Sequence, residues 1–405
     1  MTTRTAAALP RLHRDRFTGT MYGVFVTWGW LLYSFNPSVP LLARELGVSN
    51  AAAGLHGTAM AVGALAAAAL TPRAVLRLGR RTTLVVAAVV VAAGIALLTT
   101  GWVLAATLTG MAVVAVGGNM AVSAAQAGLA GHHGRSASAA VTEANGVGSG
   151  VGLIGPLAVG ACVAAGWGWR PAVAVTAVLA LGTALLVRRL PLTGVLARRG
   201  TVAAGPAVAG AARAVRASRW FLVTVVAALA LENATTYWAT DLVRERTGAG
   251  AGIATATTAG LVAGMTIIRF VVGPLSLRVS PARLLAGAFG VAIAGWAVLW
   301  TATTAPVALA GLFLAGLGYG AHYPLGVALL LGASGGATDA AQARATVGGG
   351  LAIGVAPFVL GALADAVGAH TAFLVVPVLA LVGGCAALAG ARAWTREQPA
   401  ALPAP

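Results

Sequence analysis

Apolar residues fill most of the chain in long runs, and charged residues occur in short clusters between these runs. A run of about 20 apolar residues is long enough to cross the hydrocarbon core of a bilayer as a helix. The pattern therefore predicts an all-α integral membrane protein with twelve transmembrane helices. The predicted spans lie at about 18–42, 51–72, 82–100, 103–128, 138–163, 171–188, 219–242, 251–275, 284–304, 306–331, 345–364 and 371–391.

The overall composition agrees with this pattern. Hydrophobic residues make up 59% of the 405 residues and charged residues only 9%, whereas soluble domains carry about 25% charged residues. An ordinary soluble protein is therefore excluded. The first apolar run is too long for the core of a signal peptide, so we expect it to stay in the protein as the first transmembrane helix.

The charge of the chain comes from arginine. All 26 basic residues are arginines, against nine acids, which gives a formal net charge of +17. These arginines flank apolar spans, where they set topology and contact anionic lipid head groups, so we expect no nucleic-acid partner. With the N-terminus in the cytoplasm, 21 arginines lie inside and four outside. We therefore predict an N-in/C-in, multi-pass protein of the cell inner (cytoplasmic) membrane.

The longest polar-tolerant segment, 188–218, separates the twelve spans into two sets of six. We predict a cytoplasmic N-terminal tail (1–17), an N-terminal six-helix bundle (18–190), a cytoplasmic linker (191–218), a C-terminal six-helix bundle (219–391) and a cytoplasmic C-terminal tail (392–405). The two sets resemble each other: LLARELG at 41–47 overlays DLVRERT at 241–247, and GPLAVGA at 155–161 overlays APFVLGA at 356–362. Matches in order at offsets of 200 or 201 indicate an internal duplication, hence two pseudo-symmetric bundles.

Two six-helix halves joined by a basic loop resemble the major facilitator superfamily of secondary transporters, over essentially the whole chain. The loop after the second span reads PRAVLRLGRR, with Pro72 and Leu76 where that family has Gly and Asp. The missing Asp implies that the network closing the protein uses other partners. The loop keeps the family's glycine and the arginines to which the resemblance assigns a gating role: Gly79, Arg77, Arg80 and Arg81.

The fifth span contains GVGSGVGLIGP at 146–156, which is similar to the glycine-rich helix 5 motif of antiporters in that family. Glycines also allow plain close packing of helices, so both interpretations stay open. Near the start of this span, Glu143 overlays Arg344 in the eleventh span. We interpret this pair either as a latch between the halves that breaks during alternating access, or as two interfacial charges in water.

Two charged residues fall deep inside predicted spans, away from the span ends. Glu232 lies about midway along the seventh span, and Arg269 lies in the cytoplasmic half of the eighth. A charge in the membrane is costly and needs a partner or a function. Three roles are open for Glu232: proton coupling with Arg269, binding of a cationic substrate, or a static pair that holds two helices together.

Polar and aromatic residues gather in spans 1, 4, 7 and 10, the spans that line the central cavity in the family resembled. His322 in span 10 has an imidazole suited to carry a second proton, or is a hydrogen-bonded packing residue. The site has one acid and several rings, which is typical of a small organic substrate. The candidate substrate residues are Trp30, Tyr33, Asn36, Asn119, Ser123, Asn233, Thr236, Tyr237, Trp238, Tyr319 and Tyr323.

Other functional classes find little support. The two cysteines, Cys162 and Cys385, lie in apolar runs, so we expect no metal and no cofactor. The absence of lysine excludes a P-loop in this chain, and we expect no enzymatic activity. We predict a monomeric secondary transporter that moves a small organic compound by alternating access, by proton-coupled export. Proton-coupled uptake of a small metabolite is the alternative.

Overall fold

The computed structural model describes residues 13–133, 136–196, 216–276, 278–334 and 338–397. Most of the predicted tails (1–17 and 392–405) and of the predicted linker (191–218) lies outside these ranges. Within them the regular structure is entirely helical. The elements of the first half are α1 (Arg16–Phe35), η1 (Asn36–Ser38), α2 (Val39–Leu46), α3 (Asn50–Leu78), α4 (Arg80–Thr100), α5 (Leu104–His133), α6 (Ala137–Gly152), α7 (Ile154–Ala164), α8 (Arg170–Arg189) and η3 (Gly194–Leu196).

The second half repeats this order. Its elements are α9 (Arg216–Thr247), α10 (Ala251–Thr257), α11 (Ala259–Ser276), α12 (Pro281–Thr301), α13 (Ala305–Gly332), α14 (Thr338–Val367), α15 (Ala369–Ala372) and α16 (Val375–Glu397). Each of the twelve predicted spans thus corresponds to one helix or to consecutive helical segments. Four spans are interrupted, and proline explains two of the breaks: Pro37 and Pro40 lie where α1 gives way to η1 and α2, and Pro156 follows the break between α6 and α7.

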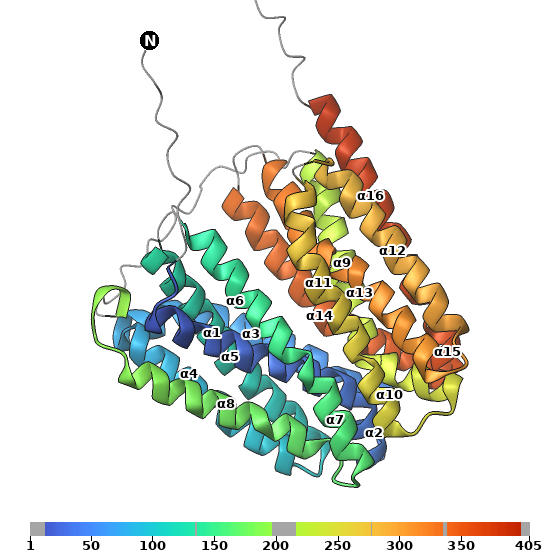
Figure 1. Ribbon diagram of the computed structural model, residues 1–405, viewed down its shortest axis with the longest axis horizontal. Helices are drawn as coiled ribbons and strands as arrows, with labels where there is room; N and C mark the ends of the chain where they lie inside the picture. The colour runs from blue at the N-terminus through green and yellow to red at the C-terminus, as the bar shows by residue number, and fades with distance from the viewer. Residues whose placement is uncertain (1–12, 134–135, 197–215, 277, 335–337, 398–405) are drawn as a thin grey trace, which may run out of the picture.

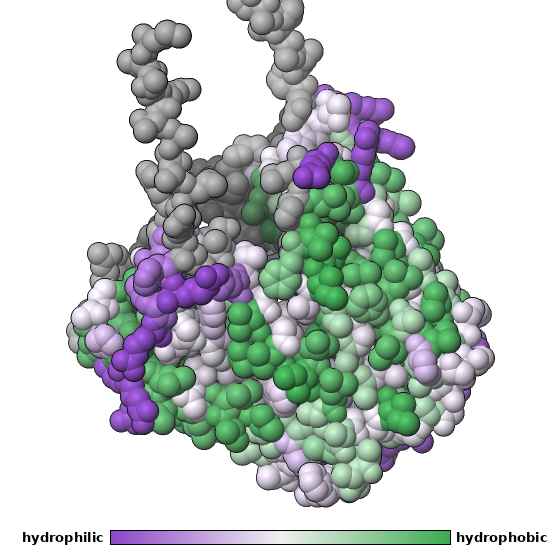
Figure 2. Space-filling view, in the orientation of Figure 1, coloured by the Kyte–Doolittle hydropathy of each residue, from purple (hydrophilic) through white to green (hydrophobic). Residues whose placement is uncertain are grey.

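Eleven of these helices or helix pairs in the described part of the chain are long and apolar enough to cross a membrane. The first predicted span is not among them, because threonine, glycine, tyrosine and tryptophan residues dilute the apolar character of α1. Large apolar side chains nevertheless cover the outer surfaces of the molecule, as on α8 and α16, and Figure 2 shows this apolar coat on the face in view. Lipid tails are the solvent that such a surface requires.

The two halves pack side by side and meet mainly at one end of the molecule (Figure 1). The packing between the halves runs through α3 against α14, α7 against α10, and η1 against α9. We call the end that contains α2, α7 and α10 the closed end. The helices of the two halves diverge toward the opposite end, where α1 begins and α16 ends (Figure 1), and we call it the terminal end.

The internal duplication predicted from the sequence is visible as a matched pair of close contacts at the closed end. A Cβ on Gly160 of α7 would lie 2.6 Å from the carbonyl oxygen of Gly252. A Cβ on Gly361 of α14 would lie 2.6 Å from the carbonyl oxygen of Asn50. Gly160 and Gly361 are the residues that overlay each other in the repeat. Each half therefore uses the same small residue to bring its helix against the backbone of the other half.

Candidate functional site

The first helices of the two halves touch near the closed end through residues at equivalent positions of the repeat. The Asn36 side-chain amide donates to the Thr236 hydroxyl at 3.5 Å, an offset of 200 residues. The Thr240 hydroxyl donates to the Pro37 carbonyl at 3.1 Å. A small cavity beside this contact is lined by Tyr33 and Thr236, among others. Three predicted substrate residues, Tyr33, Asn36 and Thr236, thus lie together where the halves meet.

The acid and the arginine predicted inside the membrane have different environments. Glu232 on α9 is half-buried and forms no ion pair within the part of the chain that the structure describes. Arg269 on α11 donates to the Ser149 hydroxyl of α6 at 2.5 Å, and its charge also interacts with Tyr33 and Glu232. Arg269 therefore connects the second half to two helices of the first, and it does not pair directly with Glu232.

Ser149 is a residue that the sequence analysis did not select. In the sequence, Ser149 is distinguished only as the single polar residue of the GVGSGVG segment. The neighbouring glycines place α6 against α1: a Cβ on Gly148 would lie 2.6 Å from the Phe25 carbonyl oxygen, and one on Gly152 would lie 2.9 Å from that of Gly29. This contact is the close packing that we considered as one interpretation of the segment. It leaves Ser149 directed toward α11.

The three residues predicted as a cluster on the tenth span, Tyr319, His322 and Tyr323, lie in different surroundings. Tyr319 is buried and its hydroxyl shares a hydrogen bond with Thr235 of α9 at 2.8 Å. His322 stacks on Phe289 of α12, with ring centroids 3.9 Å apart, inside the second half. Tyr323 is 42% exposed. His322 therefore has the contacts of a packing residue, whereas Tyr323 is accessible to a ligand.

Several other candidates donate hydrogen bonds within their own halves. Trp30 donates to the Ala172 carbonyl of α8 at 2.9 Å, and Trp238 donates to the Pro357 carbonyl of α14 at 2.8 Å. Tyr237 is completely buried. The amides of Asn119 and Asn233 donate to carbonyls of their own helices at 2.8 Å, while Ser123 is exposed. Trp30 therefore packs within its own half, whereas the Trp238 ring lies beside the contact of Gly361 with Asn50, where the two halves meet.

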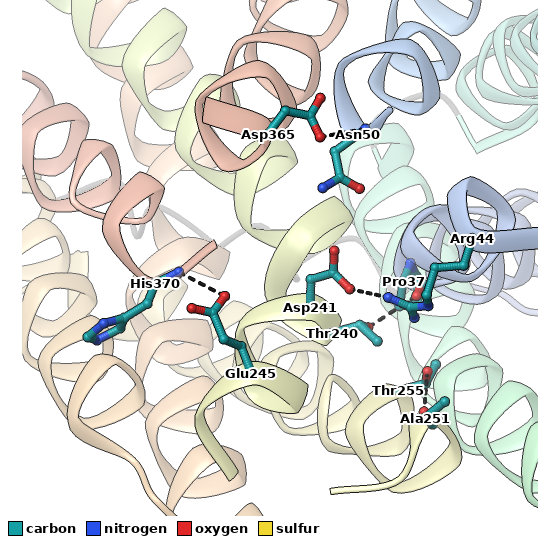
Figure 3. Close-up of polar contacts among 10 residues, drawn as sticks. All are labelled: Pro37, Arg44, Asn50, Thr240, Asp241, Glu245, Ala251, Thr255, Asp365 and His370. Atoms are coloured by element: carbon teal, nitrogen blue, oxygen red, sulfur yellow. Dashed lines mark hydrogen bonds and ion pairs between the residues drawn. The ribbon is translucent and has the colours of Figure 1, made fainter. Parts of the chain in front are cut away.

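Two charged contacts join the halves at the closed end (Figure 3). Arg44 of α2 forms an ion pair with Asp241 of α9 at 2.5 Å. Asp365, near the end of α14, accepts hydrogen bonds from the backbone N–H groups of Asn50 and Ala51 at 2.9 and 2.8 Å. These are free donors at the positive N-terminus of α3, so a carboxylate is stabilised there. Both contacts have to break if this end opens.

Two further acids at the closed end form contacts within one half. Glu45 accepts hydrogen bonds from the Trp169 indole at 2.6 Å and from Arg170 at 2.9 Å. Glu245, which overlays Glu45, accepts from the backbone N–H of His370 at 3.3 Å (Figure 3). These two contacts are equivalent in the repeat, whereas the Arg44–Asp241 and Asp365 contacts have no counterpart of the same kind among the described residues. The bridges between the halves are therefore an asymmetric feature of the chain.

At the terminal end, Glu143 does not form the ion pair with Arg344 that the predicted latch between the halves requires. Glu143 pairs with Arg14 at 2.6 and 2.8 Å, so in this structure its partner is Arg14 of the same half and not Arg344. The reason is that the start of α1 lies beside α6, while the halves diverge here. Asp15 caps α1 by accepting from the Thr18 N–H at 2.8 Å. Burial acts to raise the pKa of Asp15, but hydrogen bonds from Thr18 and His132 outweigh it and lower the pKa to about 2.

Of the three predicted gating arginines, Arg80 reaches the Val195 carbonyl of η3 at 3.4 Å. Arg77 and Arg81 form no ion pair with any residue that the structure describes. The hydrogen bond of Arg80 therefore lies within its own half. A gating role for these arginines stays a prediction.

Comparison with known proteins gives a family match and fold matches. The sequence model described as Major Facilitator Superfamily matches residues 20–335. The fold is similar to the crystal structure of the nucleoside transporter NupG, with a TM-score of 0.71 and 12% identity over 94% of this chain and 98% of that chain. It is similar to a bacterial homolog of the human lysosomal transporter Spinster in an inward-facing and occupied conformation (TM-score 0.71, 13% identity, 97% and 100% covered).

A third similar structure is the E. coli fucose:proton symporter, with a TM-score of 0.61 and 17% identity over 93% of this chain and 99% of that chain. At these identities the likeness concerns the fold. No curated protein sequence matches the chain significantly.

The Arg44–Asp241 pair provides a test of the closed end. We expect Arg44→Ala and Asp241→Ala each to weaken this end by about 0.5 to 1 kcal/mol, as for partly exposed ion pairs. The charge swap Arg44→Asp with Asp241→Arg is expected to restore it. The measurement is the distance distribution between spin labels at positions 103 and 303, two exposed closed-end sites, with Cys162 and Cys385 replaced by alanine.

In this experiment the single variants shift the label distances to longer values, and the swapped variant returns them to those of the parent. Glu245→Gln is the matched control, because it removes a charge from α9 whose contact lies within one half. A swapped variant that stays as open as the single variants would contradict the assignment of this pair as a bridge between the halves.

Proposed function

The chain belongs to the Major Facilitator Superfamily, and from this premise we propose that it exports a small organic compound across the cytoplasmic membrane in exchange for protons, by alternating access. The observation that carries the proposal is the half-buried Glu232, which forms no ion pair with a described residue, beside an arginine that donates to Ser149 of the other half. The bias of arginines toward the terminal end supports an orientation with both termini in the cytoplasm. In that orientation the structure is sealed on the outside and its site faces inward.

Glu232 is the group that binds the proton in this proposal. A carboxylate at this depth is costly when it is charged and alone, so it is stable either protonated or bound to a cationic substrate. The two states exclude each other because they use the same oxygens. Such competition is sufficient for exchange: substrate arriving from inside displaces the proton, and a proton arriving from outside displaces the substrate.

Arg269 determines whether Glu232 is free to take part. Its hydrogen bond to Ser149 and its interaction with Tyr33 hold the guanidinium on the side of the first half. Without these partners, Arg269 would turn to Glu232 and neutralise it as a static ion pair. Ser149 is therefore a positioning residue, and the contact of α6 with α11 keeps the acid available while the terminal end is open.

The substrate site combines Glu232 with the groups that lie where the halves meet. Tyr33, Asn36 and Thr236 supply one ring and hydrogen-bonding groups, and Tyr323 supplies an accessible second ring. Aromatic faces and one carboxylate suit a small organic cation or an amphipathic ring compound. The same carboxylate would also serve proton-coupled uptake. Export and uptake are distinguished by whether protons move in the opposite direction to the substrate or in the same direction.

Replacement of the acid tests the coupling. In an efflux-deficient bacterial host, wild type is expected to protect against members of a panel of organic cations, dyes and antibiotics, and Glu232→Gln is expected to abolish that protection at equal membrane expression. In proteoliposomes, addition of a protective compound should drive protons in the opposite direction in wild type only. Glu245→Gln, on the same helix, serves as the control that keeps activity.

The outcomes separate the elements of the proposal. If Glu232→Gln protects as well as wild type, export stands and the coupling role of Glu232 is wrong. If wild type sensitises the host, and substrate and protons move in the same direction, the protein is a symporter for uptake.

Ser149→Ala tests the positioning of Arg269. Removal of the hydroxyl releases Arg269 toward Glu232, and a nearby positive charge favours an ionised carboxylate. We therefore expect the pH dependence of transport to move toward acid, so that half-maximal transport requires a lower pH. The measurement is the pH profile of uptake into proteoliposomes, with Ser149→Thr as the variant that keeps the hydroxyl. A lower rate with an unchanged pH profile would indicate a packing role alone.

A further inference from the structure

Two adjoining cavities flank the last turns of α16 at the terminal end. The larger, about 770 Å³, lies between α16 and α12 and is lined by Arg283, Arg392, Trp394 and Leu388, among others. The second, about 360 Å³, lies between α16 and α9 and is lined by Arg216, Trp220, Arg392 and Arg396, among others. Arg392 borders both cavities. None of the predicted transport residues contributes to either of them.

The charge of these cavities is entirely positive. Four arginines line them, and no acidic residue is among the described residues of their linings. In the described ranges none of the four arginines forms an ion pair with the protein. Elsewhere on the molecule arginines do find carboxylates, as Arg14, Arg44 and Arg170 show. The cluster around α16 therefore has a charge that an external anion can neutralise.

The surface next to the arginines is apolar and faces the lipid. Leu381 and Leu388 precede Arg392 by 11 and four residues, which places all three on one face of α16. Leu381 is 56% exposed and Leu388 42%. Figure 2 shows hydrophilic residues gathered at the end of α16 beside a broad apolar surface. A ligand that satisfies this face needs an anionic group joined to hydrocarbon chains.

We propose that this end of α16 is a binding site for an anionic phospholipid of the adjacent leaflet. Its phosphate lies against Arg392, which offers two parallel donors to phosphate oxygens, and its acyl chains follow the exposed leucines of α16. Trp220 and Trp394 border the cavities with indole rings, which favour the level of the head groups. Because Arg392 separates two basic cavities, a lipid with two phosphates, such as cardiolipin, fits better than one with a single phosphate.

Binding of defined lipids to the purified full-length protein tests the site. Native mass spectrometry with added tetraoleoyl cardiolipin is expected to show specific binding to wild type, and Arg392→Gln to weaken it by about fivefold, the contribution of one arginine near a lipid surface. Arg392→Lys keeps the charge without the paired donors and should lie between the two. Dioleoyl phosphatidylcholine should bind all of them alike, which also shows that the variants are folded.

Arg188→Gln is the matched control, because Arg188 is an exposed arginine at the same end of the first half. It should leave cardiolipin binding unchanged. Equal weakening by Arg188→Gln would show a diffuse charge effect and overturn the site. Equal binding by Arg392→Gln and wild type would do the same. Displacement of the lipid by millimolar inorganic phosphate would identify a site for free phosphate instead of a lipid site.

Discussion

The hydrocarbon core of a bilayer offers no hydrogen-bond partners, and this constraint determines how the chain can place a charge. Backbone groups satisfy it by forming helices throughout the spans. Charged side chains satisfy it by lying at helix ends, where Arg44, Asp241 and Asp365 find partners in the opposite half. Glu232 and Arg269 lie deep inside the spans. Arg269 donates to Ser149, and Glu232, which forms no ion pair with a described residue, is the group to which we assign the proton or the substrate.

The duplicated architecture explains how the halves come together and where they differ. Gly160 and Gly361 make equivalent close approaches, and Asn36 meets Thr236 at the position expected for the axis that relates the halves. The charged bridges at the closed end lack this symmetry. A symmetric surface allows the halves to rock against each other, and the charged bridges at the closed end add stability to that end. Substitutions in these bridges can therefore change the free energy that keeps the closed end shut without changing the fold.

The positions of the helices could be predicted from the sequence, because about 20 apolar residues have one stable arrangement in a bilayer. The directions of the side chains could not. Periodicity predicts that Tyr319, His322 and Tyr323 share a face of one helix, but not that His322 stacks on Phe289 while Tyr323 stays exposed. Trp30 was expected near a substrate and packs on α8 instead. Ser149 escaped notice because its importance depends on which helix faces it, and spacing within one segment contains no such information.

In the proposed mechanism the two ends of the molecule open and close in opposite ways, linked through Glu232. Hydrogen–deuterium exchange of wild type and Glu232→Gln in lipid nanodiscs at one pH tests it most directly, since the amide side chain mimics a protonated acid. We predict opposite changes: exchange rises in α2, α7 and α10 at the closed end and falls in α6 and the first turns of α14 at the terminal end, or the reverse. Changes of the same sign at both ends, or no change at either, would contradict it.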